Sequence, residues 1–135
     1  MSILLTGFDA FGGEAVNPSW LMLEAFNGTH IEGHAVHARC LPTAFGHSLL
    51  ALAQHIDDLQ PDLVIAFGQA GGRSTVSLER VAVNCDDARI ADNAGNQPVD
   101  TRIFAHAQNA YFNTLVIKAT LLALQQAGIP ADISN

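Results

Sequence analysis

The chain has 135 residues, which is enough for one domain with its own core but not for two. Hydrophobic residues make up 49% of the sequence and charged residues only 14%, a composition that argues against intrinsic disorder. The formal net charge is −7, from 13 acidic residues against 6 Lys and Arg, so the chain lacks the basic surface by which proteins bind nucleic acid or anionic membranes.

The first half of the chain alternates short apolar runs with helix-length segments. A buried strand is expected at Ile3–Leu5, before a glycine-rich turn at residues 7–13. Asn17 followed by Pro18 is typical of a helix start, because proline fits the first helical turn. A second strand is expected at Ala35–Leu41. Apolar residues at helical spacing then predict a helix that includes Leu49, Leu50, Ala53 and Ile56.

The second half continues this alternation. A strand at Leu63–Phe67 leads into the loop GQAGGR at residues 68–73, and another strand is expected at Ser77–Asn84. Leu115–Ala127 has the pattern of an amphipathic helix, ended by glycine and proline. Residues 131–134 have the composition of a further strand.

Alternating strands and helices predict one α/β domain over residues 1–135. We expect a three-layer α/β/α sandwich with a largely parallel, mixed central sheet, truncated at its C-terminal side because the chain stops where a strand begins. A sheet that lacks its last strands exposes apolar surface, so we expect poor solubility or partner-dependent folding. In such sheets functional residues gather at the carboxyl ends of strands, where both glycine loops lie.

Neither the cysteines nor the histidines form a recognisable metal or disulfide pattern. Cys40 and Cys85 are too few for a disulfide framework and form no CxxC pair, so no metal is expected. The N-terminus has no positively charged segment followed by a long apolar one, and the apolar runs are too short to span a bilayer. A cytoplasmic protein without membrane association is therefore expected.

The two glycine loops each allow a structural and a functional interpretation. The first, GFDAFGG, matches neither GxGxxG nor GxxxxGK[ST], and its lack of lysine opposes a nucleotide-binding module. Its aromatic residues, Phe8 and Phe11, are either core residues or the apolar wall of a small-ligand pocket. In the second loop Gln69 is either a solvated turn residue or an amide suited to recognise another amide or a lactam.

Glu79 is expected inside an otherwise apolar strand, where a carboxylate needs a partner because an unpaired buried charge is costly. One interpretation is a salt bridge to Arg80 or Arg89. The other is that Glu79 orients a histidine as the third member of a nucleophile–base–acid triad.

The chain resembles the type I pyroglutamyl peptidases through a series of segments in the same order. These are GFDAFGG, NPSW, LPT, GQAGGR, LERVAVN, DDARI and DNAGNQP, and the resemblance continues from residues 110–117 to GIPADISN. It implies a Cys-His-Glu peptidase that removes an N-terminal pyroglutamyl residue from peptides without a metal or organic cofactor. It also implies assembly into a homo-oligomer, a dimer or a tetramer.

Carried over position by position, the resemblance implies that Glu79 is the acid of the triad. Seven further positions match the family's substrate pocket: Phe8, Phe11, Asn17, Thr43, Gln69, Arg89 and Ile90. Of these, Asn17 and Gln69 match groups that hydrogen-bond the lactam and its surroundings, while Arg89 matches an arginine close to the catalytic cysteine.

The family's nucleophile lies in a segment T-A-G-x-[FY]-[VL]-C-N after a stretch like Ser134-Asn135, and its histidine lies further on. We therefore expect the 135-residue chain to be inactive by itself. Cys85 does not replace the nucleophile, since six residues of regular strand would place it roughly 20 Å from Glu79. The alternative is a truncated or vestigial module that folds or binds ligand without turnover.

Overall fold

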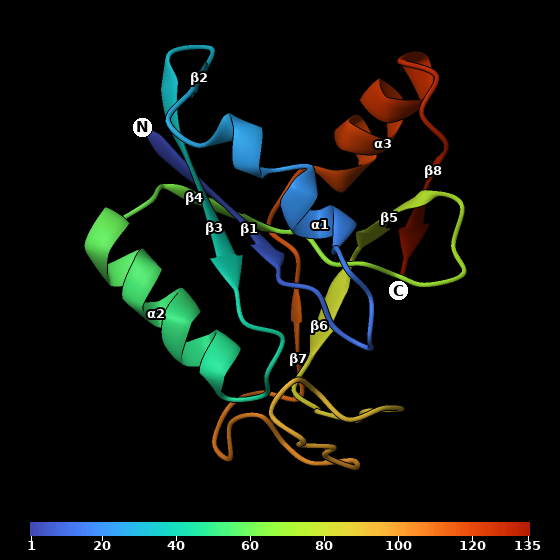
Figure 1. The fold of residues 1–135 in the computed structure, drawn as a ribbon. Coiled ribbons are helices and arrows are strands. Elements are labelled where there is room, and N and C mark those ends of the chain that lie inside the picture. The colour runs from blue at the N-terminus through green and yellow to red at the C-terminus, as the bar shows by residue number, and fades with distance from the viewer. The chain divides into compact units, whose positions relative to one another are not determined.

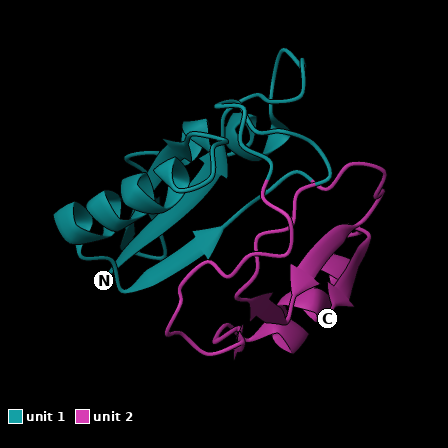
Figure 2. Cartoon of the chain, turned by 90° about the horizontal axis from the view of Figure 1, so that it is seen from below, with its two compact units in different colours: residues 1–69, 89–97 teal, residues 70–88, 98–135 magenta.

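The computed structural model describes all 135 residues, which fold as two compact units (Figures 1 and 2). Unit 1 consists of Met1–Gln69 together with Arg89–Gln97. Unit 2 consists of Ala70–Ala88 together with Pro98–Asn135. The chain therefore leaves unit 1, returns to it for one short segment, and then completes unit 2.

Unit 1 is built on a four-stranded sheet with the order β2-β3-β1-β4, in which β3, β1 and β4 run parallel and β2 is antiparallel to β3. Helix α1 contacts β1, while the 3-10 helix η1 and helix α2 contact β3 (Figure 1). The elements of unit 1 in chain order are β1 (Ser2–Phe8), α1 (Pro18–Leu21), η1 (Glu24–Phe26), β2 (His30–Ile31), β3 (His34–Leu41), α2 (His47–Leu59) and β4 (Leu63–Ala66).

The core of unit 1 lies against its sheet. One cluster of buried side chains consists of Leu5, Leu23, Val36 and Ala38, with Ile3, Trp20, Ile65 and Phe67 packed around it. Side chains alternate along a strand, so Leu4 and Thr6 of β1 point to the opposite face. Both are completely buried. The two faces of this sheet are thus both covered, as is usual for parallel strands.

Helix α1 begins at Pro18 because Asn17 caps it. The Asn17 Oδ1 accepts hydrogen bonds from the backbone N and the Oγ of Ser19, at 3.0 and 2.8 Å. An N-cap asparagine satisfies a backbone donor that the helix leaves unpaired. The Ser19 Oγ in turn accepts from the backbone N of Phe8 at 3.0 Å, which ties α1 to the end of β1. The predicted helix start is confirmed.

Unit 2 contains two two-stranded ladders, a parallel one between β5 and β8 and an antiparallel one between β6 and β7. Helix α3 contacts β8. The elements of unit 2 are β5 (Val76–Glu79), β6 (Val81–Val83), β7 (Ala110–Phe112), α3 (Ile117–Gln126) and β8 (Ala131–Ser134).

The single strand expected at Ser77–Asn84 is wrong, because the structure has two strands separated at Arg80. The backbone N of Arg80 donates to Ser134 O at 2.8 Å, whereas its carbonyl accepts from the backbone N of Asn113, also at 2.8 Å. At this residue the chain changes its partner from β8 to β7. The strand ends where its hydrogen-bond partner changes and not where the sequence pattern changes.

The two units differ in the number of buried residues that they contain. Every buried residue of the chain lies within unit 1, from Leu4 to Ala44, and unit 2 has none. Large apolar side chains of unit 2 remain exposed, for example Phe112 at 76% and Val116 at 75%. Helix α3 is amphipathic in sequence but has no buried residue.

The fold class is confirmed as α/β with a mixed, mostly parallel arrangement of strands, although the strands form three separate ladders. The other predicted strands and helices form within a few residues of their expected bounds. No helix is both long enough and apolar enough to cross a membrane. The single domain over residues 1–135 stays a prediction.

Candidate functional site

The candidate site residues are distributed between the two units. The seven predicted substrate-binding residues all belong to unit 1, whereas Glu79 belongs to unit 2. Within unit 1, Phe8 is the last residue of β1, and the others lie in the loops after β1, β3 and β4 and in the segment Arg89–Gln97. Three of these loops follow the carboxyl ends of adjacent parallel strands, the usual place for a ligand site in such a sheet.

Asp9 connects the loops after β1 and β3. Its carbonyl accepts from Nδ2 of Asn17 at 3.0 Å and from Oγ1 of Thr43 at 2.9 Å. Its carboxylate Oδ1 accepts from the backbone N of Thr43 at 2.7 Å. Two predicted pocket residues are therefore held by the residue that directly follows Phe8.

The aromatic residues of the first loop are half-buried and do not belong to the buried core cluster. Ile90 meets this loop at Gly12, where an ideal Cβ would lie 3.7 Å from Ile90 Cδ1. Ile90 itself is 39% exposed. Phe8, Phe11 and Ile90 therefore offer apolar surface that is still accessible, as the wall of a pocket would be.

The polar candidate residues differ in how many of their hydrogen-bonding groups already have a partner within the chain. Asn17 is buried, its Oδ1 accepts two hydrogen bonds and one of its two amide hydrogens is donated to Asp9 O. One amide hydrogen is left to donate. Gln69 and Arg89 are exposed, and their side chains make no hydrogen bond within the chain. No side-chain hydrogen bond or ion pair joins these two to the other candidates.

Asp92 organises the segment that carries Arg89 and Ile90. Its Oδ2 accepts from the backbone N of Phe45 at 2.6 Å, and its Oδ1 accepts from the backbone N of Ala94 and Asn96 at 2.9 and 2.8 Å. Partial burial acts to raise the pKa of this carboxyl, but the hydrogen bonds from Phe45, Asn96 and Ala94 outweigh it and lower the pKa. The charged form is thus the one that holds the segment.

This lowered pKa predicts how unit 1 responds to acid. Because the folded-state pKa of Asp92 lies below the ordinary value of 3.8, its contribution to stability is fully present above pH 3.8 and is lost as the pH falls through the folded-state pKa. We expect the wild-type chain to exceed Asp92→Asn in free energy of unfolding near neutral pH. The difference should shrink below pH 3.8 in urea titrations. A difference that stays constant to pH 2 would contradict this role.

Glu79 is the last residue of β5, and its side chain is 58% exposed. The expectation of a carboxylate buried inside an apolar strand is therefore wrong, because β5 ends here. Its ion-pair partner is Arg73, with Nη1 and Oε1 3.4 Å apart, and neither Arg80 nor Arg89. Arg80 instead donates from Nε to Oδ1 of Asn135. An exposed pair of this kind contributes about 0–1 kcal/mol, so Glu79 remains available to another partner.

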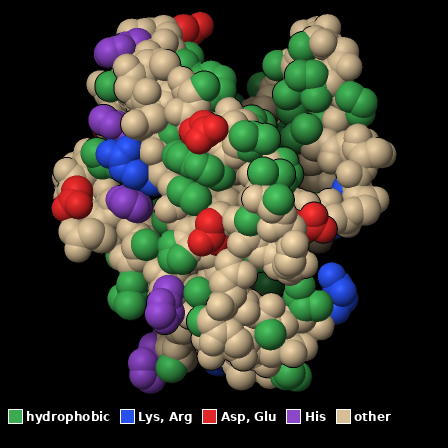
Figure 3. Space-filling view, viewed as in Figure 1, with side chains coloured by type: hydrophobic (Ala, Val, Ile, Leu, Met, Phe, Trp, Pro, Cys, Tyr) green, Lys and Arg blue, Asp and Glu red, His purple; other side chains and the backbone are tan.

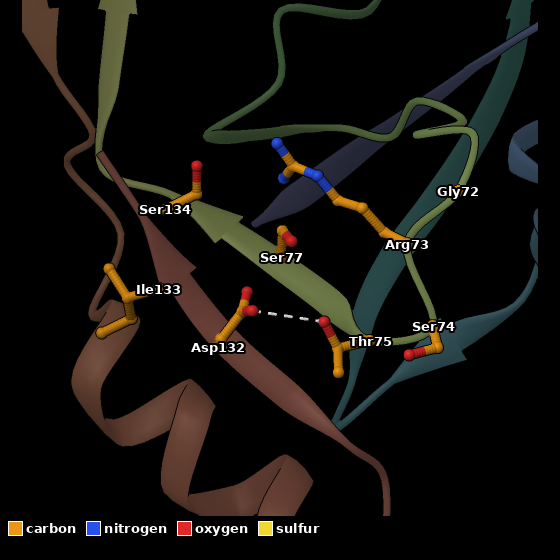
Figure 4. Close-up of a pocket in the computed structure, with 8 residues that line it drawn as sticks. All are labelled: Gly72, Arg73, Ser74, Thr75, Ser77, Asp132, Ile133 and Ser134. Carbon is orange, nitrogen blue, oxygen red and sulfur yellow. Dashed lines mark hydrogen bonds between the residues drawn. The ribbon is translucent and has the colours of Figure 1, made fainter.

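A polar pocket of about 460 Å³ lies beside this pair in unit 2 (Figure 4). Its lining residues are Gly72, Arg73, Ser74, Thr75, Ser77, Asp132, Ile133 and Ser134. Figure 4 shows Thr75 and Asp132 facing each other, joined by a hydrogen bond of 3.2 Å. The Oγ of Ser77 is buried and has no hydrogen-bond partner. This polar lining suits a pyrrolidone ring less well than the apolar side chains of unit 1.

Both cysteines are half-buried free thiols. Burial, together with the charges of Asp9 and Glu24, raises the pKa of Cys40. Burial, a hydrogen bond to Asp100 and nearby aspartates raise the pKa of Cys85. A nucleophilic cysteine needs a lowered pKa, since the thiolate is the reactive form. Neither thiol is therefore activated within this chain.

The charged side chains form neither a basic patch on the visible face (Figure 3) nor a metal site. Figure 3 shows Lys and Arg side chains on the visible face only as isolated patches. No group of three or more His, Cys, Asp and Glu side chains is arranged to hold a metal ion.

The profile of the protein family described as pyroglutamyl peptidase matches residues 1–135, the full length of the chain. The chain belongs to this family. It is 57% identical to a pyrrolidone-carboxylate peptidase of Klebsiella pneumoniae and 53% identical to one of Yersinia pestis, in each case over 133 residues. Each match covers 98% of the chain and 62% of the relative. The chain thus spans less than two thirds of the length of these relatives.

Solved structures of pyroglutamyl peptidases share the fold. A mutant pyrrolidone carboxyl peptidase from P. furiosus matches with a TM-score of 0.98 at 44% identity, covering 100% of this chain and 65% of that one. Pyroglutamyl peptidase I of Bacillus amyloliquefaciens matches with a TM-score of 0.95 at 44% identity, covering 98% of this chain and 65% of its own. The arrangement of strands and helices is therefore that of the family.

Sequence reasoning did not single out the residues that hold the candidate site together. Asp9, Asp92 and Asn93 make hydrogen bonds between loops up to 84 positions apart in the chain. The available signal was that Asp and Asn stand next to alanines and glycines in turn-like segments, which predicts loops but not their partners. Arg73 was noted in its loop but was not paired with Glu79.

Proposed function

We propose that this chain provides the substrate pocket and the triad acid of a cysteine exopeptidase that removes N-terminal pyroglutamate from peptides. The observation that carries the proposal is the cluster in unit 1, where Asp9 joins Asn17 and Thr43 beside the aromatic loop that Ile90 contacts. The membership of the family supports the same chemistry.

Recognition of pyroglutamate requires a pocket that reads an uncharged lactam. The residue has no free α-amine, so no acidic group is needed to hold a positive charge. Phe8, Phe11 and Ile90 supply apolar surface for the ring, and the remaining amide hydrogen of Asn17 and the uncommitted amide of Gln69 supply hydrogen bonds. A substrate lacking the lactam would leave such groups unpaired, which is how a polar site rejects the wrong residue.

Glu79 is proposed to orient the histidine that serves as general base. That base would take the proton of a cysteine thiol, whose thiolate attacks the scissile carbonyl and forms an acyl-enzyme that water hydrolyses. Arg89 is proposed to lie close to the oxyanion, since its guanidinium forms no ion pair within the chain. Cys40 and Cys85 are not assigned as the nucleophile, because the pKa of each thiol is raised.

The test is fluorophore release from L-pyroglutamyl-7-amido-4-methylcoumarin, with the L-prolyl compound as a matched control. We expect the 135-residue chain to bind the pyroglutamyl compound without turnover, because neither thiol is activated. A chimera that adds the part of the Klebsiella pneumoniae relative that the chain does not cover should release the fluorophore. Iodoacetamide and Glu79→Gln should each abolish that release.

The opposite results are equally informative. Alkylator-sensitive turnover by the 135-residue chain would make Cys40 or Cys85 the nucleophile and overturn the assignment. A chimera that folds but neither binds the pyroglutamyl compound nor releases the fluorophore would refute the proposed pocket. Binding without turnover in the chimera would favour the second candidate function, a ligand-binding module, which the raised pKa values of both thiols favour. The homo-oligomer and the cytoplasmic location stay predictions.

A further inference from the structure

Asn93 contacts two of the other loops that carry candidate pocket residues of unit 1. Its backbone N donates to Thr43 O at 3.0 Å, in the loop after β3. Its side-chain Nδ2 donates to Ala10 O at 2.8 Å, in the loop after β1, with a longer contact of 3.4 Å to Oδ1 of Asp9. One residue of the segment Arg89–Gln97 thus meets two loops from distant parts of the chain.

These contacts close a ring of hydrogen bonds among three loops. Asp9 Oδ1 also accepts from the backbone N of Thr43 at 2.7 Å, so Asp9, Thr43 and Asn93 are joined pairwise. In a closed ring, no loop separates from the other two without breaking at least two links. Ile90 lies three residues before Asn93 and rests on Gly12.

We infer that Asn93 is a positioning residue that holds the segment Arg89–Gln97, and with it Ile90 and Arg89, against the aromatic loop after β1. The consequence of this inference rests on the proposed function. It is that Phe8, Phe11 and Ile90 form a binding wall only while the side-chain amide of Asn93 donates to Ala10 O. Asn93 touches no reacting group in this role.

Because Asn93 lies outside the buried core, its positioning role can be tested apart from the stability of unit 1. Asn93 is exposed, and no residue of the segment Arg89–Gln97 is buried. The core cluster of unit 1 is formed by β1, β3 and the segment after α1. Loss of the Asn93 side chain should therefore leave the sheet and its core intact, and also the links to Thr43 O and Phe45 N, while the segment loses its hydrogen bond to the loop after β1.

The decisive variant is Asn93→Ala, with Asn96→Ala as the matched control. Asn96 is an amide of the same size in the same segment, but its side chain hydrogen-bonds Asp92 within the segment. Asn93→Asp adds a second arm, because it keeps the size and replaces the donor with a carboxylate that faces Ala10 O. In all variants the 135-residue chain is studied by NMR, with L-pyroglutamamide as the ligand probe.

Three readouts are measured together: the NOE between the Ile90 methyl and Gly12 Hα, the dissociation constant for L-pyroglutamamide, and the thermal midpoint. For Asn93→Ala and Asn93→Asp we expect loss of the NOE and roughly tenfold weaker binding, the change that about 1.4 kcal/mol produces. The thermal midpoint should stay near that of Asn96→Ala. Asn96→Ala should keep both the NOE and the affinity.

Each outcome decides the inference. Retention of the NOE and of wild-type affinity in Asn93→Ala would overturn it, as would equal losses in Asn96→Ala. A fall in thermal midpoint that accounts for the weaker binding would reduce Asn93 to a structural residue. If the wild-type chain does not bind L-pyroglutamamide, the proposed function fails, while the NOE still decides whether Asn93 positions Ile90.

Discussion

Replacing Gly7 with alanine is expected to destabilise unit 1 by about 3 kcal/mol or more, since overpacking against backbone leaves little room for relaxation. An ideal Cβ on Gly7 would lie 2.6 Å from Ser19 O and 2.8 Å from Trp20 N. Both atoms belong to the backbone of α1, so no side-chain rotation relieves the clash. The strand end and the helix would have to separate, which would also break the hydrogen bond from Phe8 N to Ser19 Oγ.

Urea denaturation followed by circular dichroism measures this loss. The matched control is Gly68→Ala, since a Cβ at Gly68 meets no atom within 4 Å and Gly68 has no positive φ. It should change the free energy of unfolding only slightly. Equal stability of the two variants would show that α1 does not pack against β1 as described.

Replacing Asn17 with alanine is expected to lower the free energy of unfolding by about 2 kcal/mol and to weaken binding of L-pyroglutamamide. The substitution removes the N-cap of α1 and leaves the buried Ser19 Oγ without the oxygen to which it donates. It also releases Asp9, whose carbonyl accepts from Asn17 Nδ2. Urea denaturation and NMR titration measure the two effects.

Asn17→Asp separates these two roles, because aspartate caps helices as well as asparagine does but has no amide hydrogen to donate. We expect it to retain the contribution of the cap but not that of the hydrogen bond to Asp9 O, because its carboxylate cannot donate to that carbonyl, while its affinity for the ligand falls as in Asn17→Ala. If Asn17→Asp bound the ligand like wild type, the proposed contact of Asn17 with the lactam would be wrong.

The strands and helices of unit 1 were predictable because their signals are local. An uninterrupted apolar run predicted β1, the glycine loop that begins at Gly68 bounded β4, and Asn17 with Pro18 predicted the start of α1. In each case, neighbouring residues carry both the propensity and the stop signal. The family resemblance added the catalytic interpretation, which no local pattern supplies.

The end of β5 was not predictable, because it depends on which strand lies next to it. The segment from Ser77 to Asn84 has the residue types of one continuous strand, yet Arg80 turns from β8 to β7. Glu79, the residue before this change, has a side chain that is 58% exposed. Strand pairing is a non-local property, so propensity cannot report it.

The candidate site was predictable in its residue types but not in its geometry. Phe8, Phe11 and Gln69 stood out because aromatic and amide side chains in glycine loops are suited to a small ligand. The ring joining Asp9, Thr43 and Asn93 was invisible, since it links positions separated by 34 and 84 residues. Only the fold brings these loops to one edge of the sheet.

The lack of buried residues in unit 2 has a calorimetric consequence. The heat capacity change of unfolding comes mainly from apolar surface that becomes hydrated, and the apolar side chains of unit 2, such as Phe112 and Val116, are already largely in contact with water. Unfolding of unit 2 would therefore add little to that change. In a calorimeter, unit 1 would therefore contribute more than unit 2 to the heat capacity change per residue.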